Sequence, residues 1–392
     1  MRNFIQLFLE LFRVIKYNVY IRIENHDNVT ALYPIHQKFQ AKFVSFNGYQ
    51  MPLHYSSGML NEHIFTRNHC SLFDVSHMGQ LIINGENVIN EFEKLIPAEI
   101  SNLNNNHSVY SVLTNINGGV IDDLIVTRNL ESIRLVINAA NKKQVIEYLT
   151  THLNNCSIVE MTDYSLIAIQ GPLSEKVLSN YITGHENLNF MTGMNAQIGN
   201  KEIYISRSGY TGEDGFEISI SNKLVIDFVD ELLKNDNIQL AGLGSRDSLR
   251  IEAGLCLYGN ELTNRVTPVE AKISWVISKN QSTNHFPGSE IIFDQLKNKS
   301  KKIRRGIICD GNFIVRKDTD ILNINGENIG IVTSGCFSPI LNRSIAMAFI
   351  DRNYTNDQQK VYFKIRGKIR EGKITNLPFV PHKYVYVKEK AS

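Results

Sequence analysis

The chain contains one stretch that signals a hairpin turn followed by a strand, Asn117–Val126 (NGGVIDDLIV). Asn-Gly-Gly is a turn signal, and the β-branched run after it favours a strand. That strand carries Asp122 and Asp123, although aspartate is disfavoured inside strands. Because neighbouring strand residues point to opposite faces, we expect the two carboxylates not to form a dyad, with one facing a pocket and the other facing solvent or a turn. The alternative is that both cap the turn through hydrogen bonds to the backbone.

The segments on either side of this turn alternate in type. Short β-branched and aromatic runs are followed by stretches with helical spacing, which is typical of α+β organisation. We expect strands at residues 79–84, 121–128, 132–138, 166–169, 202–207 and 215–220. We expect helices at residues 57–69, 87–95, 142–153, 173–178, 223–234 and 245–255.

The chain changes character near residue 285. A polar stretch and then a basic one precede short, closely spaced strand-like runs at residues 305–309, 328–333, 344–350 and 359–365. Such spacing is typical of a small antiparallel barrel or sandwich. We therefore expect one region over residues 32–285 and a C-terminal β domain over residues 286–392.

Length and composition exclude several classes of protein. With 392 residues, 43% of them hydrophobic and 20% charged, the chain has the composition of a soluble globular protein of two or three domains. Its 41 basic and 39 acidic residues leave a net charge of +2, which favours neither nucleic acid nor an anionic membrane as a partner. No apolar run reaches the roughly 20 residues of a membrane-spanning helix.

The cysteines are equally informative. All five lie far apart, with no Cys-x-x-Cys pair. This spacing indicates neither a zinc site nor a disulfide framework, and it fits a reducing compartment.

The N-terminal segment differs from the rest of the chain. Apolar residues recur at helical spacing between Phe4 and Ile15, while Arg2 and Arg13 contribute positive charge. A basic amphipathic N-terminus is the pattern of a mitochondrial transit peptide. We therefore expect residues 1–31 to be a transit segment and the protein to reside in the mitochondrial matrix. A secretory signal and an ordinary first helix are the alternatives.

A second candidate segment is Ser206–Ile220 (SRSGYTGEDGFEISI). Three glycines within seven residues dictate a tight, irregular turn that enters a strand. The pattern is not the Gly-x-Gly-x-x-Gly of a dinucleotide site, so a phosphate cradle is not favoured. Glu217 falls on the polar face of that strand, where its carboxylate either binds a pair of N–H groups or is merely solvated.

A third candidate segment is Gly244–Gly254 (GSRDSLRIEAG), which has helical spacing. Arg246 and Arg250 lie one turn apart on the same face of this helix. Because like charges so placed repel, we expect an anionic partner for at least one of them. That partner is either a ligand or a carboxylate on a neighbouring helix.

A fourth segment, Phe73–Gly79 (FDVSHMG), contains the residue types of a Ser/His/Asp triad. Sequence neighbours on one strand do not converge, so we do not expect a triad. We expect His77 to be a hydrogen-bonded structural residue and Met78 to form the wall of an apolar site.

Together these segments resemble the glycine cleavage T-protein family, the aminomethyltransferases. The likeness runs from about residue 33 to residue 384, and six segments occur in the family's order. They are FDVSHMG at 73–79, GGVIDDL at 118–124, QGP at 170–172, YTGEDGFE at 210–217, SRDSLR at 245–250 and TSG with SP at 333–339.

The resemblance implies a three-lobed fold, in which two interleaved α+β lobes and a C-terminal antiparallel β-barrel surround a folate channel. It implies transfer of the aminomethyl carbon from the lipoyl arm of H protein to tetrahydrofolate. The products are then 5,10-methylenetetrahydrofolate, ammonia and dihydrolipoyl H protein. The implied partners are lipoylated H protein and the other glycine cleavage components, and we expect the chain itself to be monomeric.

Position by position, the resemblance assigns Asp123 as the catalytic aspartate beside the folate nitrogens. A strand carboxylate aimed into a pocket can orient such nitrogens and stabilise a developing cation. Glu217 matches the pterin-binding glutamate, and two carboxylate oxygens suit the paired N–H edge of a pterin. The other folate or substrate contacts that we expect are Arg246, Asn138, Tyr210, Met78 and Tyr384.

One departure from the family and two rival functions remain. Phe46–Tyr49 (FNGY) replaces the usual Phe-Ala-Gly-Trp, which alters packing but keeps an aromatic residue. A folate-dependent demethylase would carry a flavin domain upstream, for which this chain has neither room nor fingerprint. A folate-binding factor of iron–sulfur cluster assembly would carry a Lys-Gly-Cys-x-x-Gly-Gln-Glu type motif, which is absent here.

Overall fold

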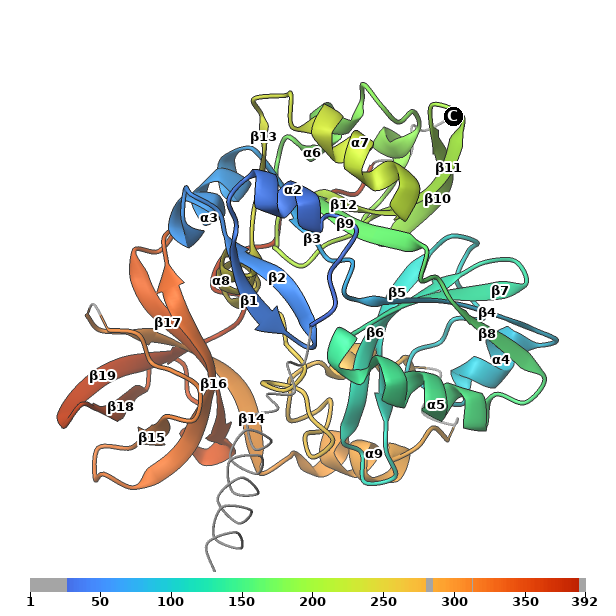
Figure 1. Ribbon diagram of the computed structural model, residues 1–392. Coiled ribbons are helices and arrows are strands. Elements are labelled where there is room, and N and C mark those ends of the chain that lie inside the picture. Colours follow the sequence, from blue (N-terminus) through green and yellow to red (C-terminus); the bar gives the residue numbers. More distant parts are fainter. Residues whose placement is uncertain (1–26, 280–284, 312, 388–392) are drawn as a thin grey trace, which may run out of the picture.

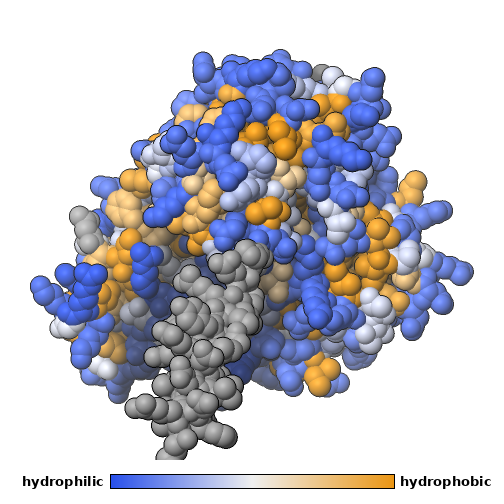
Figure 2. Space-filling view, in the orientation of Figure 1, coloured by the Kyte–Doolittle hydropathy of each residue, from blue (hydrophilic) through white to orange (hydrophobic). Residues whose placement is uncertain are grey.

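The computed structural model describes residues 27–279, 285–311 and 313–387, which form three lobes around a central junction (Figure 1). Two lobes are built on open sheets flanked by helices, and the third is a closed barrel. The predicted fold, α+β with a C-terminal antiparallel β-barrel, is therefore confirmed. Hydrophilic residues dominate the face seen in Figure 2, and apolar residues form smaller groups between them.

The first lobe is a six-stranded sheet with the strand order β10-β11-β12-β9-β3-β13. On β12, alternate residues such as Phe216 and Ile218 point into a core that α2, α6 and α7 cover. The strands are β3 (Cys70–Asp74), β9 (Tyr164–Gln170), β10 (Thr192–Ile198), β11 (Lys201–Arg207), β12 (Gly215–Ser221) and β13 (Ile238–Leu240). The helices are α2 (Tyr33–Lys38), α6 (Ser174–Leu178) and α7 (Asn222–Leu232), with the 3₁₀ turn η2 (His185–Asn187).

The second lobe is a five-stranded antiparallel sheet with the order β5-β6-β7-β4-β8. The chain leaves the first lobe after β3 and returns to it at β9, so the two lobes are interleaved as predicted. The strands are β4 (Gly79–Gly85), β5 (Ser108–Thr114), β6 (Val120–Arg128), β7 (Ser132–Ile137) and β8 (Cys156–Glu160). The helical elements are α4 (Val88–Glu93), η1 (Ala139–Asn141) and α5 (Lys142–His152).

The third lobe is a six-stranded barrel that closes in the order β14-β17-β16-β15-β18-β19. Closure pairs every strand and leaves no open edge. The sequence predicts four of these strands but misses the short β15 and the charged β19, which have few apolar residues in alternation. The strands are β14 (Lys302–Cys309), β15 (Asp320–Leu322), β16 (Asn328–Ser338), β17 (Arg343–Asp351), β18 (Lys360–Ile365) and β19 (Lys368–Thr375).

The remaining elements connect the lobes. Helices α3 (Met59–Asn68) and α8 (Leu243–Glu252) pack together, and α8 also contacts β16 and β17 of the barrel. The other elements are β1 (Lys42–Phe46), β2 (Tyr49–His54), η3 (Ser274–Val276), α9 (Ser289–Asn298) and η5 (Arg352–Tyr354). The predicted boundary near residue 285 borders residues 280–284, outside the described ranges, and stays a prediction. No helix in the described part of the chain combines the length and the apolar character needed to cross a membrane.

One face of each open sheet is turned toward the other lobe. On β12, Ile218 points into the first core, so the neighbouring Glu217 points the opposite way. On β7, Val136 points away from the second core and packs against Phe73 and Ala168 of the first lobe. The layer between the two sheets is therefore where polar strand residues of both lobes meet.

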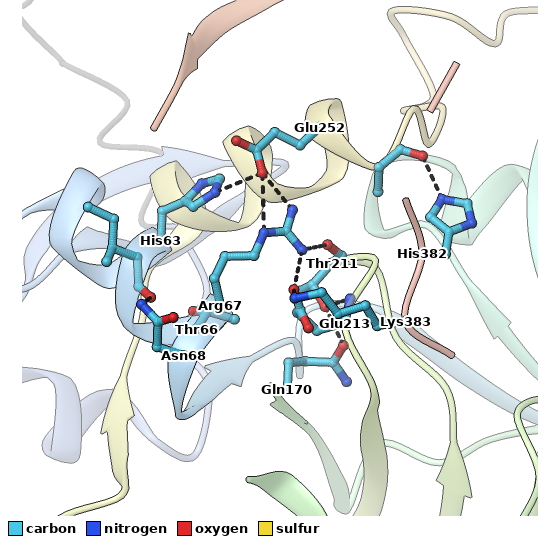
Figure 3. A network of polar contacts seen from close by, with 12 residues as sticks. His63, Thr66, Arg67, Asn68, Gln170, Thr211, Glu213, Glu252, His382 and Lys383 are labelled. Atoms are coloured by element: carbon cyan, nitrogen blue, oxygen red, sulfur yellow. Dashed lines mark hydrogen bonds and ion pairs between the residues drawn. The ribbon is translucent and has the colours of Figure 1, made fainter. Parts of the chain in front are cut away.

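A buried ion-pair network joins the lobes (Figure 3). Arg67 of α3 donates to Glu252 at the end of α8 at 2.7 Å, and to Glu213 in the turn before β12 at 2.9 Å. Lys383 of the C-terminal segment donates to the same Glu213 oxygen at 3.0 Å. Ser338, at the end of β16, donates to Glu252. Segments that lie far apart in the sequence thus meet around the guanidinium of Arg67 and its two carboxylate partners.

The carboxylate of Glu252 is held in its charged form. Burial acts to raise its pKa, but hydrogen bonds from His63 and Ser338 and the charge of Arg67 outweigh burial, so the pKa lies below its ordinary value. A carboxylate whose pKa is lower in the folded protein stabilises the fold above its ordinary pKa. That contribution is lost as the pH falls through the pKa of the folded state.

Replacing Arg67 with methionine is expected to lower the free energy of unfolding by about 3–5 kcal/mol, because the buried Glu252 loses its arginine and the buried Glu213 keeps only the largely exposed Lys383. Urea denaturation measures the change. The control is Lys94→Met, which removes an exposed ion pair with Glu91 and is expected to cost no more than about 1 kcal/mol. Equal losses in the two variants would contradict a special role for the buried network.

Candidate functional site

The acidic pair on β6 lies inside the molecule. Asp122 is fully buried and Asp123 is half-buried. The two side chains follow opposite faces: Leu124, on the face of Asp122, belongs to the second core, whereas Val112, opposite Asp123, belongs to the apolar cluster that reaches the barrel. The expectation that one carboxylate faces solvent or a turn is therefore wrong. Asp122 can be buried because Asn138 and Asn141, which follow β7, donate hydrogen bonds to its carboxylate.

One side-chain amide bridges both carboxylates. Asn138 Nδ2 lies 2.8 Å from Asp122 Oδ1 and 2.8 Å from Asp123 Oδ1. The backbone N–H of Asn138 donates to Asp122 Oδ2 at 3.2 Å, and Asn141 Nδ2 donates to Asp122 Oδ1 at 2.7 Å. The other oxygen of Asp123 accepts a hydrogen bond from the Tyr110 hydroxyl at 3.0 Å. Opposite faces thus do not make the two carboxylates independent, because Asn138 reaches both.

Burial controls the protonation of this pair. Burial and then the negative charge of Asp123 raise the pKa of Asp122 to about 7, against the hydrogen bonds from Asn141 and Asn138. Burial also raises the pKa of Asp123, although hydrogen bonds from Tyr110 and Asn138 oppose the shift. The two carboxylates thus act on each other electrostatically, but both bind Asn138 rather than each other, so the expectation that they form no dyad sharing one proton stays a prediction.

Another residue caps the turn before the strand. Asn115 Oδ1 accepts hydrogen bonds from the backbone N–H groups of Asn117 at 2.9 Å and Gly119 at 3.1 Å. Gly119 has no space for a side chain, because a Cβ atom would lie 2.0 Å from the carbonyl oxygen of Asn264. The alternative that the aspartates cap the turn is therefore wrong.

Across the inter-lobe layer, Glu217 and Arg246 retain hydrogen-bonding capacity. Glu217 is half-buried, and Ser208 Oγ donates to its carboxylate at 3.0 Å. The Arg246 guanidinium lies over the Tyr210 ring, 4.8 Å from its centroid, and its buried Nη1 has no hydrogen-bond partner among the described residues. Desolvation lowers the pKa of Arg246, and the negative charge of Glu217 opposes the shift. The two groups thus act on each other electrostatically while remaining able to bind a ligand.

The second arginine of α8, Arg250, forms ion pairs and hydrogen bonds with other residues of the protein. Arg250 is buried, and it donates to Asp247 at 2.9 Å, to Glu261 at 2.9 Å and to Ser334 at 2.7 Å. The prediction that at least one of the two arginines has an anionic partner is confirmed for Arg250. Its buried partner, Glu261, lies in the segment after α8 rather than on a neighbouring helix.

Sequence reasoning did not identify Tyr110, the hydroxyl donor to Asp123. The signal was available in the hairpin: the turn sets the β5–β6 register, which pairs Val112 with Asp123 and Tyr110 with Ile125. A tyrosine two residues before Val112 therefore lies on the face of Asp123. Tyr110 also packs against Trp275, with ring centroids 5.4 Å apart.

Met78 and Tyr384 lie at the margins of this group. Met78 packs against the cluster that contains Phe73, and it borders a cavity of about 170 Å³. Tyr384 stacks on Phe190 with ring centroids 3.8 Å apart. Burial raises the pKa of Tyr384 to about 12, and Arg67 is among the charges that act on it. These contacts place the Tyr384 ring near the ion-pair network, and the roles of Met78 and Tyr384 stay predictions.

The FDVSHMG segment does not assemble a triad. Asp74 hydrogen-bonds to His36 at 2.9 Å and to Thr30 at 2.6 Å instead. His77 is buried, but its Nδ1 has no hydrogen-bond partner among the described residues, and its ring packs edge-on against Phe46. The expectation of a hydrogen-bonded His77 is therefore wrong, because aromatic packing surrounds the ring.

Metal binding is not indicated for the part of the chain that the structure describes. No three side chains of His, Cys, Asp or Glu come together there to hold an ion. The five cysteines are free thiols. The residues suited to a bound molecule are the acidic pair with Asn138, and Glu217 with Arg246.

Family models match nearly the whole chain. A model of the GCVT N-terminal domain matches residues 32–281, and a model of the glycine cleavage T-protein C-terminal barrel domain matches residues 302–381. The chain belongs to the glycine cleavage T-protein family. The family that the sequence motifs predicted is thereby confirmed.

Relatives of this family cover the T-protein chain almost end to end. A mitochondrial aminomethyltransferase of Dictyostelium discoideum is 39% identical over 385 residues, covering 93% of this chain and 95% of that protein. A mitochondrial aminomethyltransferase of Homo sapiens is 37% identical, covering 92% and 91%. The crystal structure of glycine cleavage system aminomethyltransferase T from Bartonella henselae superposes with a TM-score of 0.88 at 34% identity, covering 92% of this chain and all of that one.

The two arginines of α8 provide a matched test of the site. Arg250→Met is expected to lower the free energy of unfolding by about 3–5 kcal/mol, because it leaves Glu261 buried without its cation. Arg246→Met removes a cation that forms no ion pair with the residues that the structure describes, so we expect a change within about 1 kcal/mol. Urea denaturation of both variants measures the difference. A loss at Arg246 equal to that at Arg250 would show that Arg246 has a structural partner.

Proposed function

We propose that this chain is the aminomethyltransferase of a glycine cleavage system, which transfers the one-carbon unit from the aminomethyl-lipoyl arm of H protein to tetrahydrofolate. As a member of the T-protein family, the chain is a transferase that uses tetrahydrofolate. The observation that carries the proposal is the Asp123 carboxylate, held between Asn138 and Tyr110 in the inter-lobe layer.

The proposed reaction breaks two bonds to the transferred carbon and forms two. The carbon leaves the lipoyl sulfur and its own amino nitrogen, and it bonds to N5 and N10 of the folate. One folate N–H proton then leaves with the thiol of dihydrolipoyl H protein and the other leaves with ammonia. Positive charge develops on the carbon along the way, and a preorganised carboxylate stabilises such charge.

Asp123 supplies this carboxylate. Two of its hydrogen bonds come from Asn138 and Tyr110, which hold each oxygen in place before the substrate arrives. Because burial raises the pKa of Asp123 above its ordinary value, the group accepts a proton more readily than a free aspartate does. Orientation of the folate nitrogens and stabilisation of the cation are therefore its proposed roles.

Glu217 and Arg246 form the proposed folate-binding pair. Glu217 presents a carboxylate with a free oxygen, which suits the paired N–H groups of a pterin edge. Arg246 offers a buried N–H without a partner, held against Tyr210 by a cation–π contact. Asn138 and Tyr210 are further proposed contacts, and Met78 and Tyr384 are proposed at the margins of the channel.

The proposed location is the mitochondrial matrix. The curated relatives described above are named as mitochondrial enzymes. The predicted transit segment, residues 1–31, lies largely outside the described residues. The proposed partners are lipoylated H protein and the other glycine cleavage components, and the proposed free state is a monomer.

Replacing Asp123 with asparagine is expected to lower turnover by about 10²–10⁴-fold, because the amide lacks the charge that stabilises the cation and accepts the proton. Tetrahydrofolate-dependent release of ammonia from aminomethylated H protein measures the effect. The exposed Asp236→Asn serves as the matched control, with unchanged turnover expected. Full activity of Asp123→Asn would refute its assignment. Folate binding without turnover by the folded wild type would favour the assembly-factor alternative.

Replacing Glu217 with alanine is expected to weaken tetrahydrofolate binding by about 1.5–3 kcal/mol, the cost of a lost charge-assisted hydrogen-bond pair. Isothermal titration with tetrahydrofolate measures it directly. Glu202→Ala, on the exposed end of β11, is the matched control and is expected to bind like wild type. Unchanged affinity in Glu217→Ala would remove this residue from the pterin site.

A further inference from the structure

We propose that Asp122 is a positioning residue of the transfer reaction, which holds the carboxamide of Asn138 so that this amide fixes the carboxylate of Asp123. The inference rests on the role proposed above for Asp123. It assigns to the first aspartate of the pair a task separate from that of the second.

The geometry around Asn138 is that of a bridge. Its Nδ2 carries two hydrogens, and it lies 2.8 Å from Asp122 Oδ1, 2.8 Å from Asp123 Oδ1 and 3.1 Å from the backbone carbonyl oxygen of Asp123. The two shorter contacts are those to the carboxylates, so the same amide group binds both side chains. A rotation of the carboxamide that releases one carboxylate also releases the other, so the two contacts hold each other in place.

Asp122 holds Asn138 at a second point. Its Oδ2 accepts the backbone N–H of Asn138 at 3.2 Å, while its Oδ1 accepts the side-chain amide of the same residue. The backbone N–H and the side-chain amide of Asn138 are thereby both bound to one buried carboxylate. Through this clamp, Asp122 determines where the second N–H of Asn138 points, although Asp122 itself lies on the opposite face of β6 from the reacting groups.

The burial of Asp122 needs a functional explanation. A carboxylate buried in a strand costs stability unless a cation or several donors compensate it. Within the described ranges Asp122 makes no ion pair, and the charged or titratable groups that act on it or feel its charge are Asp123 and Tyr258. Side chains that break the local rules in this way concentrate at functional sites.

A purely structural role is the competing explanation, and Asn141 allows the two to be separated. Asn141 Nδ2 donates to Asp122 Oδ1 at 2.7 Å and to the carbonyl oxygen of Ile121 at 3.3 Å, at the connection from β7 to α5. If Asp122 only anchors this connection, removing Asn141 should harm the enzyme as much as removing Asp122. If Asp122 acts through Asn138, the Asn141→Ala variant keeps the bridge.

The experiment is a double-mutant cycle on the full chain, with Asp122→Asn, Asn138→Ala and both changes together. Tetrahydrofolate-dependent ammonia release from aminomethylated H protein gives kcat and the KM for tetrahydrofolate. Because an asparagine at position 122 has one acceptor oxygen for three donors, we expect kcat to fall about 10- to 100-fold, the usual cost of misplacing a catalytic group. We expect the KM to stay within about threefold.

In the Asn138→Ala background, the added effect of Asp122→Asn is expected to be below about threefold, because the bridge is already gone. Asn141→Ala is expected to keep kcat within about threefold of wild type. Multiplicative effects in the cycle, or a loss in Asn141→Ala that equals the loss in Asp122→Asn, would overturn the proposal.

Two further measurements keep the outcomes separate. Urea denaturation establishes that each variant is folded, and if Asp122→Asn is not, the cycle is run with Asp122→Ser, for which the same non-additivity is expected. Asp123→Asn is assayed beside them. Full turnover in Asp123→Asn would refute the proposed role of Asp123, whereas inactive Asp123→Asn beside fully active Asp122→Asn would refute only the present inference.

Discussion

The buried guanidinium of Arg67 is the interaction on which the position of the barrel against the first lobe depends. It pairs with Glu252 of α8 and with Glu213 of the turn before β12, and Glu213 also binds Lys383 of the C-terminal segment (Figure 3). Glu252 in turn binds Ser338 of the barrel. Burying any one of these charges without its partner would cost free energy. The segments that carry them are therefore stable in this arrangement only when they pack together. The first lobe and the barrel are held against each other by that requirement.

The site is formed where the fold leaves polar groups incompletely satisfied. On one helix, Arg250 has an internal partner for its charge, whereas Arg246 retains a buried N–H without one. On one strand, Asp122 is enclosed by amides, whereas Asp123 is held but stays half-buried. The two members of each pair are therefore at most four residues apart in sequence, and they differ in the direction of the side chain.

Local signals predicted a large part of the fold. The turn at Asn117 and the alternation after it identified β6, and similar patterns identified the other strands predicted in the open sheets and four strands of the barrel. In the open sheets, the prediction missed β3, β5, β8, β10 and β13. In the barrel it missed the short β15 and the charged β19, which are strands because they pair with neighbouring strands and not because of their own alternation. Helix α8 begins two residues earlier than predicted, at Leu243.

The sequence by itself determined the fold class and the family, and it nominated the side chains that are proposed to act in the reaction, because turn residues, hydrophobic periodicity and motif order are local properties of the chain. Only the tertiary structure decided how those side chains act on one another. Asn138 reaches Asp122 and Asp123 from 16 and 15 positions away, and Glu213 meets Arg67 from 146 positions away. Such contacts depend on which strands pair and on how helices and turns pack against them, for which no single segment carries a signal.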